Sequence, residues 1–101
     1  MLETFTAATF APHRGEPFSV RATEQIALTL TLNAITPLGP APAGAEGPRR
    51  APFSLLFHGP LSPILPQRIY HVEYEAIGAF DLFLVPLGPD PAGMRYEAVF
   101  G

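Results

Sequence analysis

Histidines are the residues best suited to metal chemistry in this chain, because it has no cysteine and only histidine and carboxylate ligands remain. They stand at positions 13, 58 and 71. His71 and Glu73 are two residues apart, a spacing that places both on one face of a strand, where they could converge on a cation. Ile69 would share that face, and a solvent-exposed strand with a charged pair explains the spacing equally well. We therefore predict no metal site.

The serines offer no clear nucleophile. A serine hydrolase needs a serine held in a strained turn, a histidine base and an acid. Ser19 and Ser54 fall inside expected strands, and Ser62 precedes a proline without flanking glycines. His58 could be drawn as a dyad with Ser62, but a loop histidine beside a turn serine is the simpler interpretation.

The carboxylates and glycines are equally unsuited to a reaction. Glu73 and Glu75 would be neighbours on one strand face, whereas glycoside hydrolysis needs two carboxylates opposed across a cleft. The glycines at 39, 44 and 47 are interleaved with prolines and lead into no helix, so they do not form a phosphate-binding loop. We predict that the protein is not an enzyme and has no catalytic residues and no cofactor.

Short segments of alternating apolar and polar residues dominate the rest of the sequence. The clearest runs from Ile26 to Ala34, where Ile26, Leu28, Leu30, Leu32 and Ala34 would share one face. Turns are expected over 75–78 and 88–93, because glycine, proline and aspartate concentrate there. The pattern predicts six strands, over residues 18–22, 26–34, 53–58, 68–74, 79–87 and 95–100.

A short helical turn is expected before the first strand. Thr6 or Thr9 could cap it, Pro12 limits its length, and Gly15 would end it. Phe5 and Phe10 would then cover one end of the core.

These elements predict one all-β domain over residues 1–101. With no helix long enough for a parallel crossover, the strands would form a small antiparallel barrel or a two-sheet sandwich of six to seven strands. Residues 38–52, rich in proline, alanine and glycine, are expected to be one long loop. We expect eight apolar residues to lie in the core or an interface: Phe53, Leu55, Phe57, Ile69, Tyr70, Phe80, Leu82 and Phe83.

Composition narrows the range of partners and locations. The net charge is −3, and the six basic residues, all arginine, are scattered, so nucleic acid is not an expected partner. No apolar stretch is long enough to span a membrane. The N-terminus lacks a Sec signal, which predicts cytoplasmic synthesis and leaves the final location open, including an extracellular one within an assembly.

Several blocks of the sequence resemble a known family. They are Phe10–Phe18, Ala51–Pro60, Leu65–Tyr70, Leu82–Gly88 and Arg95–Phe100. The sequence is similar to a family of short bacterial proteins known only as a domain of unknown function. The resemblance implies no activity and no cofactor, and it associates the chain with neighbours that resemble phage tail-collar or tail-fibre proteins.

We therefore expect a structural or assembly subunit that packs against itself or other protein subunits, in a filament or a phage-tail-like assembly. Only 15% of the residues are charged and 48% are apolar, which favours a shared interface. The last strand could leave an unpaired edge for a neighbour, with the interface residues Arg95, Tyr96, Glu97, Ala98, Val99 and Phe100. The alternative is a small barrel that binds an apolar ligand.

Overall fold

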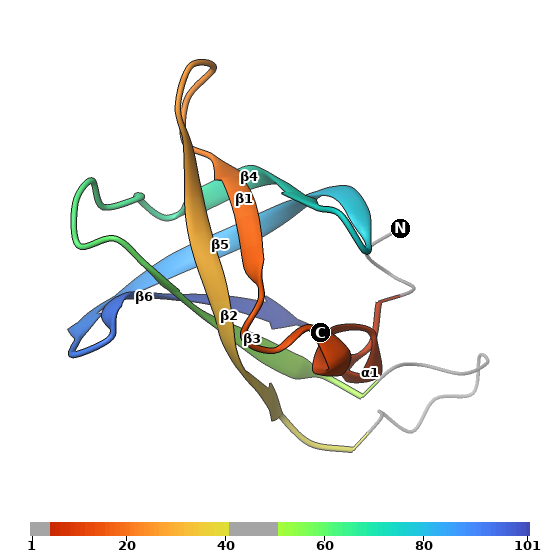
Figure 1. Ribbon diagram of the computed structural model, residues 1–101. Helices are drawn as coiled ribbons and strands as arrows, with labels where there is room; N and C mark the ends of the chain where they lie inside the picture. Colours follow the sequence, from red (N-terminus) through yellow and green to blue (C-terminus); the bar gives the residue numbers. More distant parts are fainter. Residues whose placement is uncertain (1–4, 41–50) are drawn as a thin grey trace.

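The computed structural model describes residues 5–40 and 51–101, and it shows a closed six-stranded antiparallel barrel (Figure 1). Around the barrel the strands follow the order β1-β2-β3-β6-β5-β4, so the choice between barrel and sandwich is settled. All six expected strands are present, with somewhat different ends. They are β1 (Pro17–Arg21), β2 (Ala27–Pro37), β3 (Phe53–Gly59), β4 (Arg68–Tyr74), β5 (Gly78–Asp90) and β6 (Gly93–Phe100).

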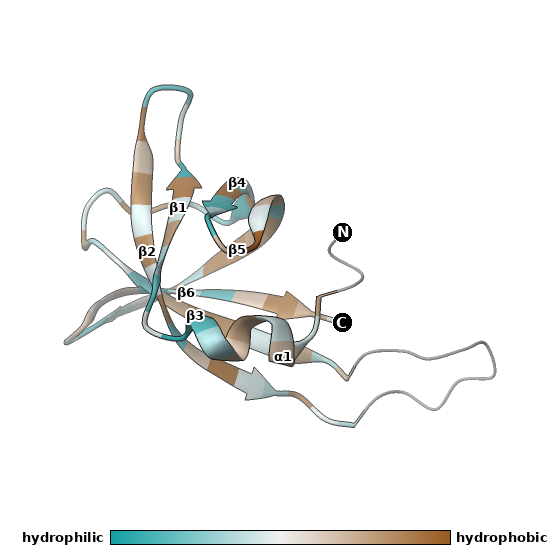
Figure 2. Ribbon diagram, turned by 45° about the vertical axis from the view of Figure 1, so that its right-hand side comes forward, coloured by the Kyte–Doolittle hydropathy of each residue, from teal (hydrophilic) through white to brown (hydrophobic). Residues whose placement is uncertain are grey.

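A short helical segment closes one end of the barrel, as the sequence predicts. It consists of α1 (Ala7–Phe10) and the 3-10 turn η2 (Ala11–His13). The Thr6 amide donates a 2.9 Å hydrogen bond to Thr9 Oγ1, which caps the helix start. Phe5 and Phe10 are both buried, and their rings meet edge to face at 5.4 Å, while Phe10 also contacts Phe100. Figure 2 shows this helix lying near the start of β3, where the Phe10 ring contacts Phe53.

The interior of the barrel is filled by side chains that alternate inward along each strand. Among the described residues, twenty-one apolar ones are buried, and six of the eight expected core residues are among them. Ile69 and Phe83 are the other two, and both point outward. The alternation expected from Ile26 to Ala34 holds from Leu28 to Leu32, with Leu28 partly buried against the core. It fails at the two ends, because Ile26 lies outside β2 and the register shifts after Leu32.

The second expected turn is wrong in its extent. β5 continues to Asp90, and only Pro91 and Ala92 separate it from β6. Beyond Leu84 the register of β5 pairs with β6 and no longer with β4. One side of β5 is therefore free of ladder hydrogen bonds, which is where proline is tolerated in a strand. The register of β5 against β6 shifts between Pro86 and Gly88, so the strand continues through this proline- and glycine-containing segment.

The prediction of an unpaired C-terminal edge is wrong for β6 as far as Glu97, where the register with β5 ends. β6 lies between β3 and β5, and it pairs with β3 from Met94 to Phe100. Arg95 and Glu97 have register partners on both neighbouring strands. Because a barrel has no free edges where its strands are paired on both sides, β6 does not offer the expected template as far as Glu97.

The connection from β3 to β4 closes the other end of the barrel. Leu65 is buried, and its amide donates a 2.9 Å hydrogen bond to Tyr96 Oη. The Tyr70 hydroxyl donates to the carbonyl of Pro66, and burial raises the pKa of Tyr70. Of the expected 38–52 loop, residues 41–50 lie outside the described part; at its base the Leu38 amide bonds the Pro52 carbonyl at 2.9 Å.

Candidate interaction surface

An apolar patch covers part of the outer face of β4 and β5. Ile69 and Phe83 are directly opposite each other in the antiparallel register, and they are 65% and 47% exposed. Val85, half-buried, follows Phe83 on the same face of β5. We call Ile69, Phe83 and Val85 the outer patch.

The outer patch is created by the strand register. The inward neighbours Tyr70, Leu82 and Leu84 are buried in the core, so alternation fixes Ile69 and Phe83 outside. Side chains directly opposite on an antiparallel pair lie about 5 Å apart at Cβ, which makes the two one continuous apolar surface. Leu87 extends the apolar character along β5 and is 40% exposed. A single exposed apolar residue is ordinary, whereas a cross-strand pair points to a contact site.

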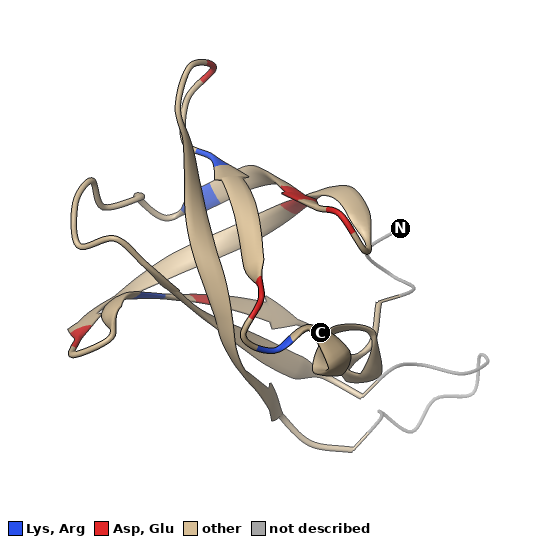
Figure 3. Ribbon diagram, in the orientation of Figure 1, with Lys and Arg blue, Asp and Glu red and all other residues tan. Residues whose placement is uncertain are grey.

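Charged residues border the outer patch on the same face. His71 Nδ1 lies 3.3 Å from Asp81 Oδ1, and His71 Nε2 lies 3.4 Å from Glu73 Oε1. The expected pairing of His71 with Glu73 on one face is thus confirmed, and Asp81 of β5 joins it. Figure 3 marks acidic positions in red along this part of β4 and β5. The face is therefore apolar at the start of β4 and charged toward its end.

The six expected interface residues on β6 divide between the two sides of the barrel wall. Tyr96, Ala98 and Phe100 point inward and belong to the core. Arg95 and Glu97 face outward and are half-buried, and Val99 is 61% exposed. Contact with a partner at this strand stays a prediction, and the inward residues could not take part in it without opening the barrel.

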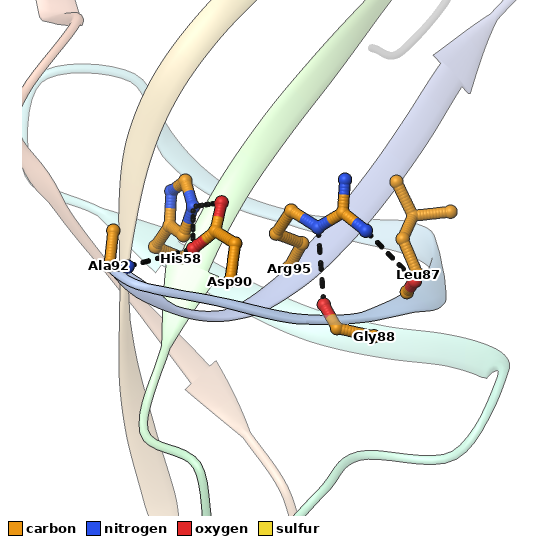
Figure 4. A network of polar contacts seen from close by, with 6 residues as sticks. All are labelled: His58, Leu87, Gly88, Asp90, Ala92 and Arg95. Atoms are coloured by element: carbon orange, nitrogen blue, oxygen red, sulfur yellow. Dashed lines mark hydrogen bonds and ion pairs between the residues drawn. The ribbon is translucent and has the colours of Figure 1, made fainter.

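His58 belongs to a polar network that joins β3 to the β5–β6 hairpin (Figure 4). Its Nε2 lies 2.9 Å from Asp90 Oδ2, and the Ala92 amide donates to Asp90 Oδ1 at 2.8 Å. The hydrogen bond with His58 holds the pKa of Asp90 below its ordinary value of 3.8.

Gly93 allows the hairpin to approach β3 closely enough for this contact. Gly93 has a φ of +139°, and a Cβ there would lie 2.5 Å from the Gly59 carbonyl oxygen. A side chain at this position would push the hairpin away from His58. Arg95 fixes the other side of the hairpin by donating to the carbonyls of Leu87 and Gly88, each at 3.2 Å.

The network places His58 in a structural contact. Its side-chain hydrogen bonds go to Asp90, and none joins it to Ser62. Ser19 and Ser54 lie within β1 and β3, as expected. Within residues 5–40 and 51–101, no group of three or more histidine or carboxylate side chains is placed to hold a metal ion. No helix in these ranges is long and apolar enough to cross a membrane.

Neither the outer patch as a pair nor the His58–Asp90 contact follows from sequence spacing. Ile69 and Phe83 were expected to be core or interface residues, but they are 14 positions apart, and only the register brings them together. His58 and Asp90 are 32 positions apart and meet through the β5–β6 hairpin. The sequence placed the turn of this hairpin at 88–93, whereas β5 continues to Asp90. Even if the strand pairs had been predicted correctly, the sequence would not have shown which side chains of each strand point outward.

Comparison with known proteins gives one match. Residues 5–100 fit the profile of a family described as a domain of unknown function (DUF6916). No curated protein and no solved structure gave a significant match. The matched range includes all six strands and the helical segment that covers the barrel.

Proposed function

Because the chain belongs to the DUF6916 family, whose description assigns no activity, we propose from its surface that it is a non-enzymatic assembly subunit that self-associates through the outer patch. The cross-strand pair of Ile69 and Phe83 carries this proposal. Both side chains are exposed on the outer face of the barrel, directly opposite each other. Burial against a second copy would remove this apolar area from water, at about 25 cal/mol per Å².

The polar groups around the patch favour protein contact over catalysis. His71 is already paired with Asp81 and Glu73, and His58 with Asp90. Each of these two histidines therefore holds a carboxylate of its own chain in place. Such charged residues are typical of the rim of a protein interface, where they limit which partners fit.

We place the assembly in a filament or a phage-tail-like structure. This part of the proposal rests only on the resemblance of five sequence blocks, which implies neighbours similar to tail-collar and tail-fibre proteins. The family description itself names no such neighbour. A small barrel with apolar side chains on its outer face suits repeated packing of identical subunits.

Binding of an apolar ligand inside the barrel has less support. Phe10, Phe18, Phe57 and Tyr96 are almost completely buried and occupy the interior. The helical segment and the β3–β4 connection close the two ends. Small barrels of this size are usually filled by their own side chains.

The proposal is tested by light scattering after size exclusion over a concentration series. The wild-type mass should rise above the 10.9 kDa of a monomer with concentration. The double variant I69T/F83T should stay monomeric, because threonine keeps the strand preference while removing the apolar surface. V99T is the matched control, since Val99 is equally exposed on another part of the barrel, and it should associate like the wild type.

A thermal unfolding scan of each variant shows that it is folded. A wild-type protein that stays monomeric at every concentration would contradict self-association. Association of I69T/F83T at the wild-type level would place the contact elsewhere.

A further inference from the structure

His71 lies beside the outer patch on the same face of the β4–β5 ladder. It follows Ile69 by two residues on β4, and its register partner Asp81 precedes Phe83 by two residues on β5. Because side chains two apart on a strand are about 7 Å from each other, the His71–Asp81 pair forms the row next to the Ile69–Phe83 pair. A second copy that covers the apolar pair therefore also approaches this charged row.

Each ring nitrogen of His71 faces a different carboxylate. Nδ1 lies 3.3 Å from Asp81 Oδ1, and Nε2 lies 3.4 Å from Glu73 Oε1. A neutral imidazole has one N–H and donates to one of the two, so its other nitrogen points a lone pair at a carboxylate oxygen. The imidazolium has two N–H groups and donates to both. The arrangement of these three residues, which we call the His71 cluster, thus fits the protonated ring better than the neutral ring.

The arginines near the His71 cluster are held by main-chain carbonyls. Arg21 is the last residue of the neighbouring strand β1, and its Nη1 donates to the Glu24 carbonyl at 3.2 Å. Arg68, at the start of β4, donates from Nη2 to the Ala22 carbonyl at 2.7 Å. Among the described residues, His71 is therefore the basic side chain that pairs with both carboxylates of the cluster.

The strands on either side of β4 place uncharged residues opposite Glu73. Its register partners are Ser19 of β1 and Ala79 of β5. Glu75 lies beyond the end of β4, in the turn to β5. The charge beside the outer patch is therefore determined mainly by the two carboxylates and the one histidine of the cluster.

Protonation of His71 changes this charge next to the proposed contact. Histidine is the side chain that gains or loses its charge between pH 5 and 8, whereas carboxylates stay ionised above about pH 6. The cluster carries two negative charges with the neutral ring and one with the protonated ring. A second copy brings an identical cluster, so the repulsion between the copies is weaker when both rings are protonated. Carboxylates that are hydrogen-bonded to the ring also cost less to remove from water.

We propose that the His71 cluster makes self-association through the outer patch dependent on pH, with the stronger contact when His71 is protonated. The inference rests on the proposed self-association and adds its regulation. Association should strengthen as the pH falls from 8 to 6, and it should weaken again when the pH is raised.

The test is sedimentation equilibrium of the full-length protein at pH 6, 7 and 8 and one ionic strength. The wild-type association constant should be at least about threefold larger at pH 6 than at pH 8, the scale of exposed ion pairs contributed by both copies. H71Q keeps a polar side chain without a titrating charge, so its association constant should be equal at pH 6 and 8. H13Q is the matched control, because His13 lies in the helical segment, and it should keep the wild-type dependence.

D81N tests the direction of the charge effect. It removes one negative charge from the His71 cluster, so at pH 8 it should associate more strongly than the wild type. E24Q removes one negative charge from the β1–β2 turn and should associate like the wild type at that pH. Circular dichroism at each pH shows that every variant is folded.

The outcomes distinguish this inference from the proposal on which it rests. Wild-type association that is equal at pH 6 and 8, a dependence that H71Q retains or H13Q loses, or weaker association of D81N at pH 8 would overturn the role of the His71 cluster and leave self-association standing. A wild type that stays monomeric at every pH and concentration would instead contradict self-association itself.

Discussion

The β4–β5 ladder and the β3–β6 ladder are alike inside the barrel and different outside it. Each ladder has seven register pairs, and each contributes large apolar side chains to the same core. On the outside, β3 and β6 carry His58 and Arg95, which bond to the β5–β6 hairpin. β4 and β5 carry the exposed Ile69 and Phe83.

The comparison distinguishes side chains that stabilise the fold from side chains that could contact a partner. Both inner faces are needed to fill one core, so neither ladder is dispensable for folding. Both ladders pair outer polar groups within the chain, but the β4–β5 ladder exposes two apolar side chains directly opposite each other, Ile69 and Phe83, whereas β6 exposes Val99 singly. A variant can therefore distinguish the two roles by which property it changes.

The largest expected effect comes from truncating the shared core. Leu55→Ala on β3 and Leu82→Ala on β5 should each lower the free energy of unfolding by about 2–5 kcal/mol, because each leaves a buried cavity. Urea denaturation measures both. A loss below about 1 kcal/mol for either one would show that the two ladders do not contribute alike.

A smaller effect is expected from one buried hydroxyl on β6. Tyr96→Phe removes the acceptor of the Leu65 amide and leaves that buried donor unsatisfied. The free energy of unfolding should fall by about 1–3 kcal/mol in the same assay. An unchanged stability would mean that the β3–β4 connection is not held by this bond.

Lowering the pH should remove the contribution of the His58–Asp90 contact to the free energy of unfolding. The hydrogen bond with His58 lowers the pKa of Asp90 below 3.8, so the contact stabilises the fold above that pH and the contribution is lost as pH falls through the folded pKa. Asp90→Asn removes this dependence. The stability difference between wild type and variant should therefore shrink as urea denaturation is repeated from pH 5 down to pH 2.5. A difference that is constant over this range would contradict the contact.

The smallest effect on stability is expected at the outer patch. Ile69→Thr and Phe83→Thr should each change the free energy of unfolding by less than about 1 kcal/mol, because both side chains are largely exposed and threonine suits a strand. Chemical denaturation at low protein concentration measures this for the monomer. A loss comparable with Leu82→Ala would show that these residues support the fold itself.

Much of the fold could be predicted because the local signals were strong. Alternation identified all six strands, and Phe5 and Phe10 were correctly expected at one end of the core. Closure of the barrel could not be predicted, since it depends on a seam of two residue pairs between β1 and β4. The end of β5 was missed because Gly88, Pro89 and Asp90 indicate a turn. Pro89 is acceptable in the strand because β5 has no register partner on β4 beyond Leu84.

The outer patch could be predicted only in part. Ile69 and Phe83 were expected in the core or an interface, and a change of register by one residue would have exchanged their direction with that of Tyr70 and Leu82. The expected interface on β6 relied on a free edge, which depends on strand order. Both the outward direction of Ile69 and Phe83 and the pairing of β6 depend on contacts between residues that are distant in sequence.

The most direct test of the outer patch uses the absence of cysteine in the chain. Val85→Cys places a small apolar thiol within the patch, and Val99→Cys places one on β6 as a matched control. Alkylation rates are measured for dilute and concentrated protein at one pH. Self-association through the patch predicts that the Cys variant at position 85 reacts more slowly when concentrated while the variant at position 99 does not; unchanged rates at both positions would contradict it.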